Sequence, residues 1–186
     1  MLTHKGTQII KTDRLILRPF RVTDAQKMYD NWASDSKVTE FLTWQPHDSV
    51  DSTKALLKLW AKEYSNYSYY NWGIELDGEL IGSIAVVDQS DEDERCDIGY
   101  CLGTAYWNHG YITEALKSVI DFLFIEAGYN RIQAWHDVNN PASGRAMVKA
   151  GMQYEGTLKQ MYAHPNGGFR DVNIYSITRS EYNGNI

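Results

Sequence analysis

The sequence of 186 residues has the length of one domain, because domains commonly contain roughly 100 to 200 residues. Hydrophobic residues make up 43% and charged residues 23%, a balance typical of a folded globular chain that excludes intrinsic disorder. The formal net charge is −6 and Lys and Arg form no cluster, which argues against a nucleic-acid partner and favours a cationic one. We therefore expect a single domain over residues 1–186.

The sequence also bears on the cellular compartment. No window approaches the roughly 20 apolar residues of a membrane span, and the first residues, MLTHKGTQIIKTDR, lack the apolar segment of a secretion signal. Cys96 and Cys101 lie in one predicted strand, where their spacing points the side chains to opposite faces and excludes a disulfide between them. We expect a reduced, cytoplasmic protein with no membrane partner.

The spacing of apolar residues predicts alternating strands and helices. Strands are expected at residues 15–20, 71–76, 79–88, 95–103, 130–138, 152–160 and 169–179. Helices are expected near 24–34, over 49–64, within 104–128 and over 141–151. The second and third strands should form a hairpin, because Asp77-Gly78 tolerates the positive φ angles of a tight I′ turn.

The middle of the chain predicts the sheet type. The strand at 95–103, the helix that follows and the strand at 130–138 form a β-α-β crossover, which makes these two strands parallel. The other connections favour antiparallel neighbours. The expected fold class is therefore mixed α/β (α+β), with a largely antiparallel sheet flanked by helices.

A glycine-containing loop precedes the helix within 104–128. Gly103 and Gly110 give this loop conformational freedom, and the unpaired backbone N–H groups of residues 108–112 can point at an anion such as a pyrophosphate. By spacing alone, an ordinary turn before a helix is the simpler interpretation.

Four segments, taken together, resemble one family. WNHGYITEAL resembles the acetyl-coenzyme A loop of the GCN5-related N-acetyltransferase (GNAT) superfamily, whose motif is Gln/Arg-x-x-Gly-x-Gly/Ala, with Trp107 and Ile112 replacing its first and last residues. DIGYCLG, NNPASGRAMVKAGM, and YEGTLKQ with FRDVNIYSITRSEY are similar to segments of the Rim-type ribosomal-protein N-terminal acetyltransferases. The resemblance extends from Asp13 to Tyr182.

The resemblance implies a fold and a cofactor site. A GNAT sheet has about seven strands, and its fourth and fifth strands are parallel and splay apart to admit the pantetheine arm of acetyl-CoA. The arm would extend the sheet edge, and a backbone N–H there would hold the thioester carbonyl. The cofactor contacts implied in this sequence are Tyr100, Cys101, Leu102, Asn108, His109, Gly110, Tyr111, Ile112, Thr113 and Asn140.

The resemblance also implies catalytic residues. Acetyl transfer needs a base near the amine and an acid near the sulfur. Glu155 lies where the Rim-type enzymes carry a glutamate proposed to accept the amine proton, and Ser143 where they carry a serine proposed to protonate sulfur. Asp97 is an alternative candidate for the base. Ser143 is equally consistent with a residue that caps the helix, and Glu155 with a solvated strand residue. No His or Cys spacing indicates a metal site.

These inferences lead to an enzyme that transfers acetyl from acetyl-CoA to a primary amine. The implied acceptor is the N-terminal α-amino group of a ribosomal or other protein. Two alternatives remain open, namely an acetyltransferase for a small amine (an aminoglycoside, polyamine or amino acid) and a non-catalytic CoA-binding regulatory module. The sequence leaves the oligomeric state open, with a homo-oligomer as one option.

Overall fold

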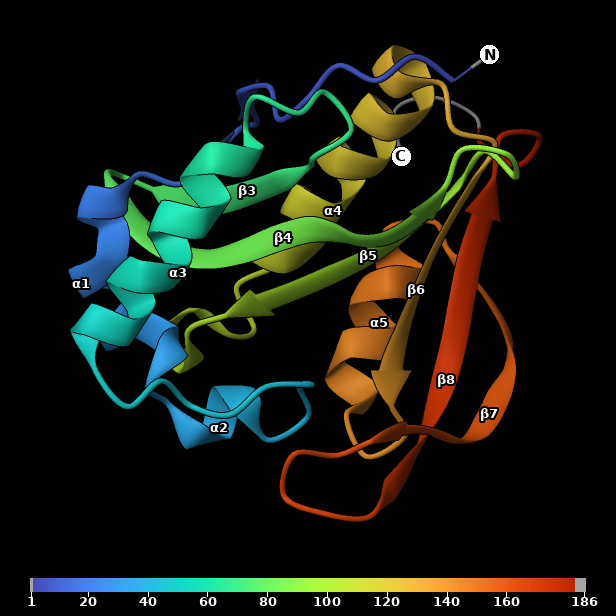
Figure 1. Ribbon diagram of the computed structural model, residues 1–186. Coiled ribbons are helices and arrows are strands. Elements are labelled where there is room, and N and C mark those ends of the chain that lie inside the picture. Colours follow the sequence, from blue (N-terminus) through green and yellow to red (C-terminus); the bar gives the residue numbers. More distant parts are fainter. Residues whose placement is uncertain (1, 183–186) are drawn as a thin grey trace.

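The computed structural model describes residues 2–182 and contains one mixed sheet flanked by helices (Figure 1). Its eight strands lie in the order β1-β2-β3-β4-β5-β6-β8-β7. The strands are β1 Ile10–Lys11, β2 Leu15–Arg18, β3 Asn71–Leu76, β4 Glu79–Ser90, β5 Arg95–Leu102, β6 Arg131–Asp137, β7 Gln153–Ala163 and β8 Phe169–Thr178. In residues 2–182, no helix is long and apolar enough to cross a membrane.

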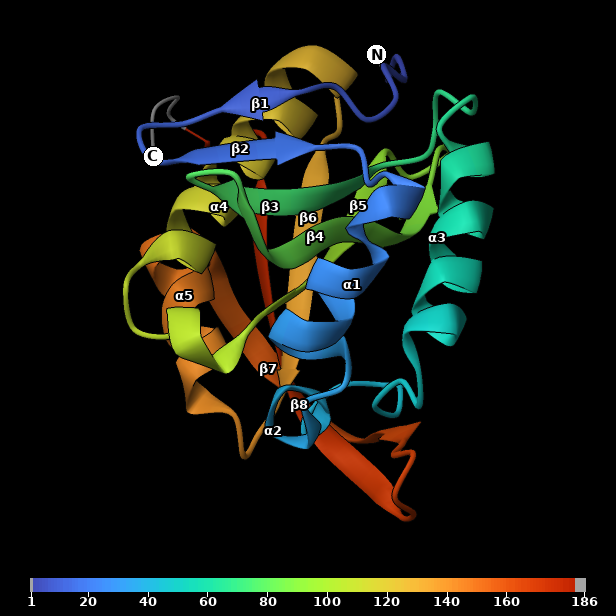
Figure 2. The same cartoon turned by 90° about the vertical axis from the view of Figure 1, so that its left-hand side faces the viewer.

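The helices cover both faces of the sheet (Figure 2). They are α1 Ala25–Met28, α2 Ser36–Thr39, α3 Val50–Glu63, α4 Tyr111–Phe122 and α5 Pro141–Lys149. One face carries α4 and α5, and the other carries α1 and α3. Two buried clusters correspond to these layers: one contains the apolar face of α4, and the other joins α1 to α3 around Trp32 and Leu57.

The hairpin of β3 and β4 confirms the predicted turn. Asp77 and Gly78 have φ angles of 49° and 81°, the left-handed values that a tight I′ turn demands. Leu76 and Glu79, on either side, face each other in the antiparallel register. Local turn chemistry therefore determines where this hairpin closes.

The parallel pair predicted from the crossover is β5 and β6. Only three positions pair, Arg95 with Arg131, Cys96 with Ile132 and Asp97 with Gln133, after which the two strands diverge (Figure 1). On its other edge β5 pairs with β4 as far as Leu102. Among residues 2–182, the last part of β5 therefore has one paired edge and one edge without a strand partner.

The structure differs from the predicted elements in several places, and β7 continues to Ala163, beyond the predicted end at residue 160. The sheet has eight strands where about seven were expected, because the short β1 pairs with β2. The helix expected near 24–34 consists of α1 and a π-helical segment, Tyr29–Ala33, and α2 follows it without having been predicted. In addition, β4 continues to Ser90, since its last residues pair with the start of β5.

Candidate active site

The loop before α4 exposes backbone donors. Gly110 is the N-cap residue, with a φ of 81°, and no side chain caps the helix. The first backbone bond of the helix runs from the Glu114 N–H to the Gly110 carbonyl at 3.1 Å, so the N–H groups of Tyr111, Ile112 and Thr113 have no acceptor within the helix. This terminus can hold an anion, because free N–H groups and the helix dipole act in the same direction.

A distant residue fixes this loop in place. The guanidinium of Arg14 donates to Glu114 at 2.7 Å and to the His109 carbonyl at 3.1 Å, and it lies 4.6 Å from the centre of the Tyr111 ring. Sequence analysis missed Arg14, because 100 residues separate it from Glu114. The contact brings a cation to the start of α4 and ties the loop to the residue that precedes β2.

The unpaired edge of β5 presents alternate residues. The Gly103 N–H donates to Ile81 on the β4 side, so strand alternation directs the backbone groups of Cys101 toward β4 as well. The groups of Tyr100 and Leu102 point toward the open edge, where the indole N–H of Trp107 already occupies the Leu102 carbonyl at 2.8 Å. Alternation therefore separates Cys101 from the two other strand residues predicted to contact the cofactor.

The start of α5 faces this edge. The side chain of Asn140 makes no hydrogen bond within residues 2–182, and no side-chain bond caps α5, so its amide is not used in a turn. The hydroxyl of Ser143 lies 2.9 Å from the phenol oxygen of Tyr100, which also contacts the Ser143 carbonyl at 3.2 Å. The sequence-predicted residues Tyr100, Asn140 and Ser143 therefore lie around the divergence of β5 and β6.

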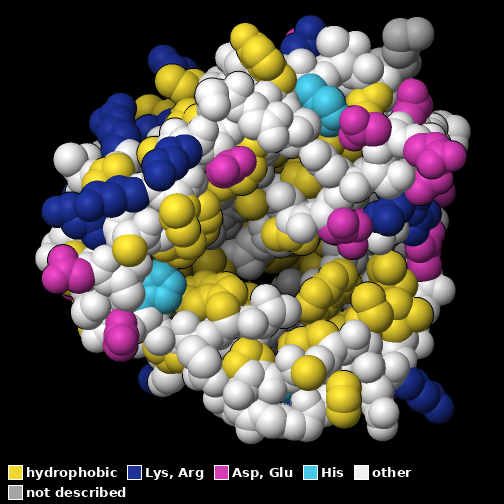
Figure 3. Space-filling model, in the orientation of Figure 1, with side chains coloured by type: hydrophobic (Ala, Val, Ile, Leu, Met, Phe, Trp, Pro, Cys, Tyr) yellow, Lys and Arg dark blue, Asp and Glu magenta, His cyan; other side chains and the backbone are white. Residues whose placement is uncertain are grey.

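Asp97 lies at the last position where β5 pairs with β6, and its side chain is on the face of the sheet opposite α4 and α5. Its neighbour Cys96 belongs to the core beneath α4, so alternation directs Asp97 toward the α1 and α3 side. The side chain is 12% exposed and contacts Arg95 at 3.3 Å. Burial raises the pKa of the carboxyl, and its hydrogen bond with Gln133 only partly opposes this. The face on this side is hollowed at its centre and bordered by hydrophobic side chains (Figure 3).

Glu155 has a different environment from the one expected of a general base. Its carboxylate accepts two hydrogen bonds from Arg131, at 2.9 and 2.5 Å, and one from Ser176 at 2.6 Å. The bonds from Arg131 and Ser176 lower the pKa of Glu155 to about 2. A carboxylate with so little affinity for a proton is a poor acceptor, so the structure gives no chemical support to the predicted role of Glu155.

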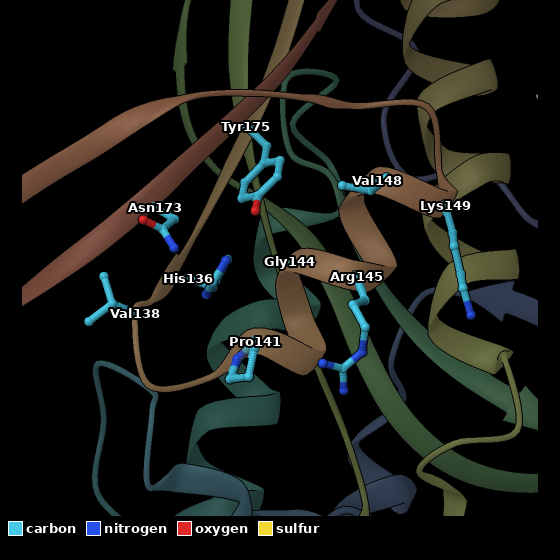
Figure 4. Close-up of a pocket in the computed structure, with 9 residues that line it drawn as sticks. All are labelled: His136, Val138, Pro141, Gly144, Arg145, Val148, Lys149, Asn173 and Tyr175. Atoms are coloured by element: carbon cyan, nitrogen blue, oxygen red, sulfur yellow. The ribbon is translucent and has the colours of Figure 1, made fainter.

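A pocket of about 400 Å³ lies on the other side of α5. His136 and Tyr175 point toward each other there beside Gly144, while Arg145 and Lys149 extend away from them (Figure 4). A side chain at Gly144 would place its Cβ 2.5 Å from the His136 Nε2, so the glycine permits close packing of α5 on β6. Ser143 and Tyr100 do not line this pocket, although its lining residue Tyr175 lies close enough to Tyr100 to contribute to the raised pKa of that phenol.

Comparison with known families identifies this arrangement. A model described as an acetyltransferase (GNAT) domain matches residues 14–153. The chain belongs to the GNAT acetyltransferase family. It is therefore an acetyl-CoA-dependent N-acetyltransferase that acts on an amine acceptor, and the loop before α4 and the open edge of β5 lie in the matched part of the chain.

Individual relatives agree with this assignment. The chain is similar to the uncharacterized N-acetyltransferase YoaA of Bacillus subtilis (strain 168), with 33% identity over 92% of this chain and 97% of the relative. It is also 31% identical to the ribosomal-protein-serine acetyltransferase of Escherichia coli (strain K12), over 53% of this chain and 54% of the relative.

Solved structures share the GNAT fold. An acetyltransferase of the GNAT family from Bacillus anthracis is 27% identical and superposes with a TM-score of 0.80 over 93% of this chain and 99% of its own. The microcin C7 self-immunity acetyltransferase MccE, in complex with acetyl-CoA and AMP, has 20% identity and a TM-score of 0.80 over 90% of this chain and 93% of its own. The splayed parallel pair seen here is accordingly part of a GNAT sheet.

Proposed function

We propose that this GNAT enzyme acetylates the N-terminal α-amino group of a protein, in the first instance a ribosomal protein. The observation that carries the mechanism is the placement of Asp97 and Ser143 on opposite sides of the point where β5 and β6 separate. Attack by the amine requires a base, and departure of the thiol requires a group such as a hydroxyl near the sulfur. This placement puts one of these groups on each side of the gap.

In this proposal the cofactor lies on the α4 and α5 side. The pyrophosphate binds the loop at Asn108, His109 and Gly110 and the N–H groups of Tyr111, Ile112 and Thr113, since these donors are free or exposed. The pantetheine arm follows the open edge of β5 at Tyr100 and Leu102, with the amide of Asn140 opposite. Cys101 contributes no backbone contact, because its groups point toward β4.

The amine approaches from the hollowed face and meets Asp97. Burial makes this carboxylate a better proton acceptor than an exposed one, and a buried position also excludes competing water. An α-amine has an ordinary pKa near 7.7–8.0, so modest assistance from Asp97, directly or through one water molecule, is sufficient. Glu155 then forms a structural ion pair between β7 and Arg131 of β6 and takes no part in the reaction.

Two features support a protein acceptor. The similar enzyme from Escherichia coli is named for a ribosomal protein. The net charge of −6 favours encounter with a cationic polypeptide. The same scaffold acts on many amines, so the acceptor has to be measured rather than inferred from the fold.

The test compares three kinds of acceptor with acetyl-CoA. A basic peptide that copies a ribosomal-protein N-terminus is paired with the same peptide blocked at its α-amine but retaining its lysines, and with a panel of aminoglycosides, polyamines and amino acids. Acetylation of only the free N-terminus, located by mass spectrometry, is expected. Transfer to a small amine with no peptide product would contradict the proposed protein acceptor but leave the acetyl-transfer reaction in place. CoA binding without transfer to any acceptor would favour a regulatory module.

A further inference from the structure

The phenol of Tyr100 touches Ser143 at two atoms. Its oxygen lies 2.9 Å from the Ser143 Oγ and 3.2 Å from the Ser143 carbonyl oxygen. Tyr100 comes from β5 and Ser143 from the first turn of α5, so the contact joins two elements that border the gap between β5 and β6. The two residues are 43 positions apart, and no sequence pattern predicts their contact.

The bonding options of these two hydroxyls are limited. A phenol carries one proton and a serine hydroxyl carries one, whereas each oxygen also accepts. When Tyr100 donates to the Ser143 Oγ, the Ser143 proton is free to point elsewhere. When Tyr100 donates to the carbonyl, the serine proton is directed back to the phenol. The position of one proton on Tyr100 thus decides where the Ser143 O–H points.

Acid strength limits what this pair can do for a departing sulfur. A free thiol has a pKa of about 8.5 and a phenol about 10, and an aliphatic hydroxyl is a weaker acid than either. Burial raises the pKa of Tyr100 further, so its phenol keeps its proton at neutral pH. A thiolate therefore cannot keep a proton taken from either hydroxyl, although it can accept a hydrogen bond from one.

We propose that Tyr100 is a positioning residue that holds the Ser143 hydroxyl so that its O–H points at the sulfur of CoA and stabilises the thiolate as a hydrogen-bond donor, without transferring its proton. This role rests on the function proposed above. It assigns to Ser143 the task that backbone donors perform for an oxyanion, namely stabilisation of charge that develops as the bond breaks.

The reaction step balances without an acid at sulfur. The amine lone pair forms the N–C bond, the C–S bond breaks, and its electron pair remains on sulfur. The proton on nitrogen passes to Asp97 and from there to solvent. The thiolate leaves with a hydrogen bond from Ser143 and takes a proton from water after release, so the products are the amide and free CoA.

The first experiment needs no acceptor. The ultraviolet absorbance of the thiolate is titrated against pH for CoA bound to the wild type, Tyr100→Phe and Ser143→Ala, as difference spectra against each protein alone. The pKa of the bound thiol should lie below the ordinary value in the wild type, and both variants should bring it closer to that value. Tyr154→Phe is the matched control, because this exposed phenol on β7 contacts Thr157 and its loss should leave the bound thiol unchanged.

The second experiment is a double-mutant cycle on turnover. Tyr100→Phe should lower kcat roughly five- to ten-fold, as loss of one hydrogen bond implies, with little change in the acetyl-CoA dissociation constant. The same change in a Ser143→Ala background should cost almost nothing, because the two residues act as a unit. The alkaline side of the pH–rate profile should keep its shape in Tyr100→Phe.

Several results would overturn the inference. One is an ordinary pKa for the thiol of CoA bound to the wild type. Another is an equal loss of kcat from Tyr100→Phe in the wild-type and Ser143→Ala backgrounds. A third is loss of the alkaline limb of the pH–rate profile in Tyr100→Phe. If Tyr100→Phe lowers the melting temperature too far for these measurements, Ser143→Thr takes its place. Thr keeps a hydroxyl at this position, so the pKa of the bound thiol should stay low. A return of that pKa to its ordinary value would contradict the role of Ser143. Absence of CoA binding by a folded wild type is a different failure, since it removes the proposed cofactor site itself.

Discussion

Asp97 and Tyr100 lie on the same strand, β5, and present their side chains to opposite faces of the sheet. Asp97 faces the side of α1 and α3, while Tyr100 reaches Ser143 on α5. The strand between them has lost its β6 partner. A thioester placed along this edge would have the base on one side and the hydroxyl pair on the other, which is the geometric content of the proposed mechanism.

Replacement of Asp97 by Asn should separate catalysis from folding. The amide keeps the size of the side chain but cannot accept the amine proton, so kcat should fall about 100-fold, within the usual range for a lost general base. The acetyl-CoA dissociation constant should stay within about two-fold, because the proposed cofactor site lies on the other face of the sheet. Steady-state kinetics with calorimetry checks both values; unchanged kcat would remove Asp97 from the reaction.

The same variant should change stability in a pH-dependent way. Burial raises the pKa of Asp97 in the folded protein, so the ionised carboxyl destabilises the fold at pH values above that raised pKa. Asp97→Asn should therefore melt above the wild type at pH 7. The difference should shrink as the pH falls through the raised pKa and vanish below about 3.9, the unfolded value. A lower melting temperature at pH 7 would show that the bond to Arg95 outweighs the burial cost.

Local patterns predicted the elements that lie close together in the chain. The positive φ angles of Asp77 and Gly78 and the parallel pairing of β5 with β6 follow from turn chemistry and from crossover topology. The glycine at the start of α4 was also predicted from the sequence, because its role depends only on the backbone close to it in the chain. These features needed no knowledge of distant residues.

Contacts between distant residues were not predictable in this way. Glu155 reads as a strand residue with a free carboxylate, but β8 inserts between β6 and β7, and Arg131 reaches across to it. That pairing determines its pKa, and no spacing near Glu155 indicates it. The contact between Tyr100 and Ser143 depends on topology for the same reason.

Glu155→Gln should affect stability more than activity. Arg131 and Ser176 lower the pKa of Glu155 to about 2, below the unfolded value of about 4.3, so the ion pair stabilises the fold above pH 4 and loses this effect as the pH falls toward 2. The side chain is 40% exposed, so solvent screening limits the loss to about 1 kcal/mol or less at pH 7. Urea unfolding of both proteins at pH 7 and pH 3 measures it, and the difference should be smaller at pH 3.

The kinetic part of this prediction uses Asp97→Asn as its comparison. If Glu155 is structural, kcat of Glu155→Gln should stay within about two-fold of the wild type, far from the loss expected of a general base. A fall in kcat equal to that of Asp97→Asn, in a folded variant, would restore Glu155 as the base and displace Asp97.

Gly110→Trp should weaken cofactor binding at the loop before α4. Gly110 has a φ of 81°, and any side chain there would point toward Arg14 and cover the free N–H groups of the helix. Gly78→Trp is a matched control, since Gly78 has the same φ of 81° and open space around its Cβ position. Both changes should cost about 1 kcal/mol of stability for the left-handed backbone. Only Gly110→Trp should weaken acetyl-CoA binding in calorimetry, by more than about ten-fold. Equal affinities of the two variants would place the pyrophosphate elsewhere.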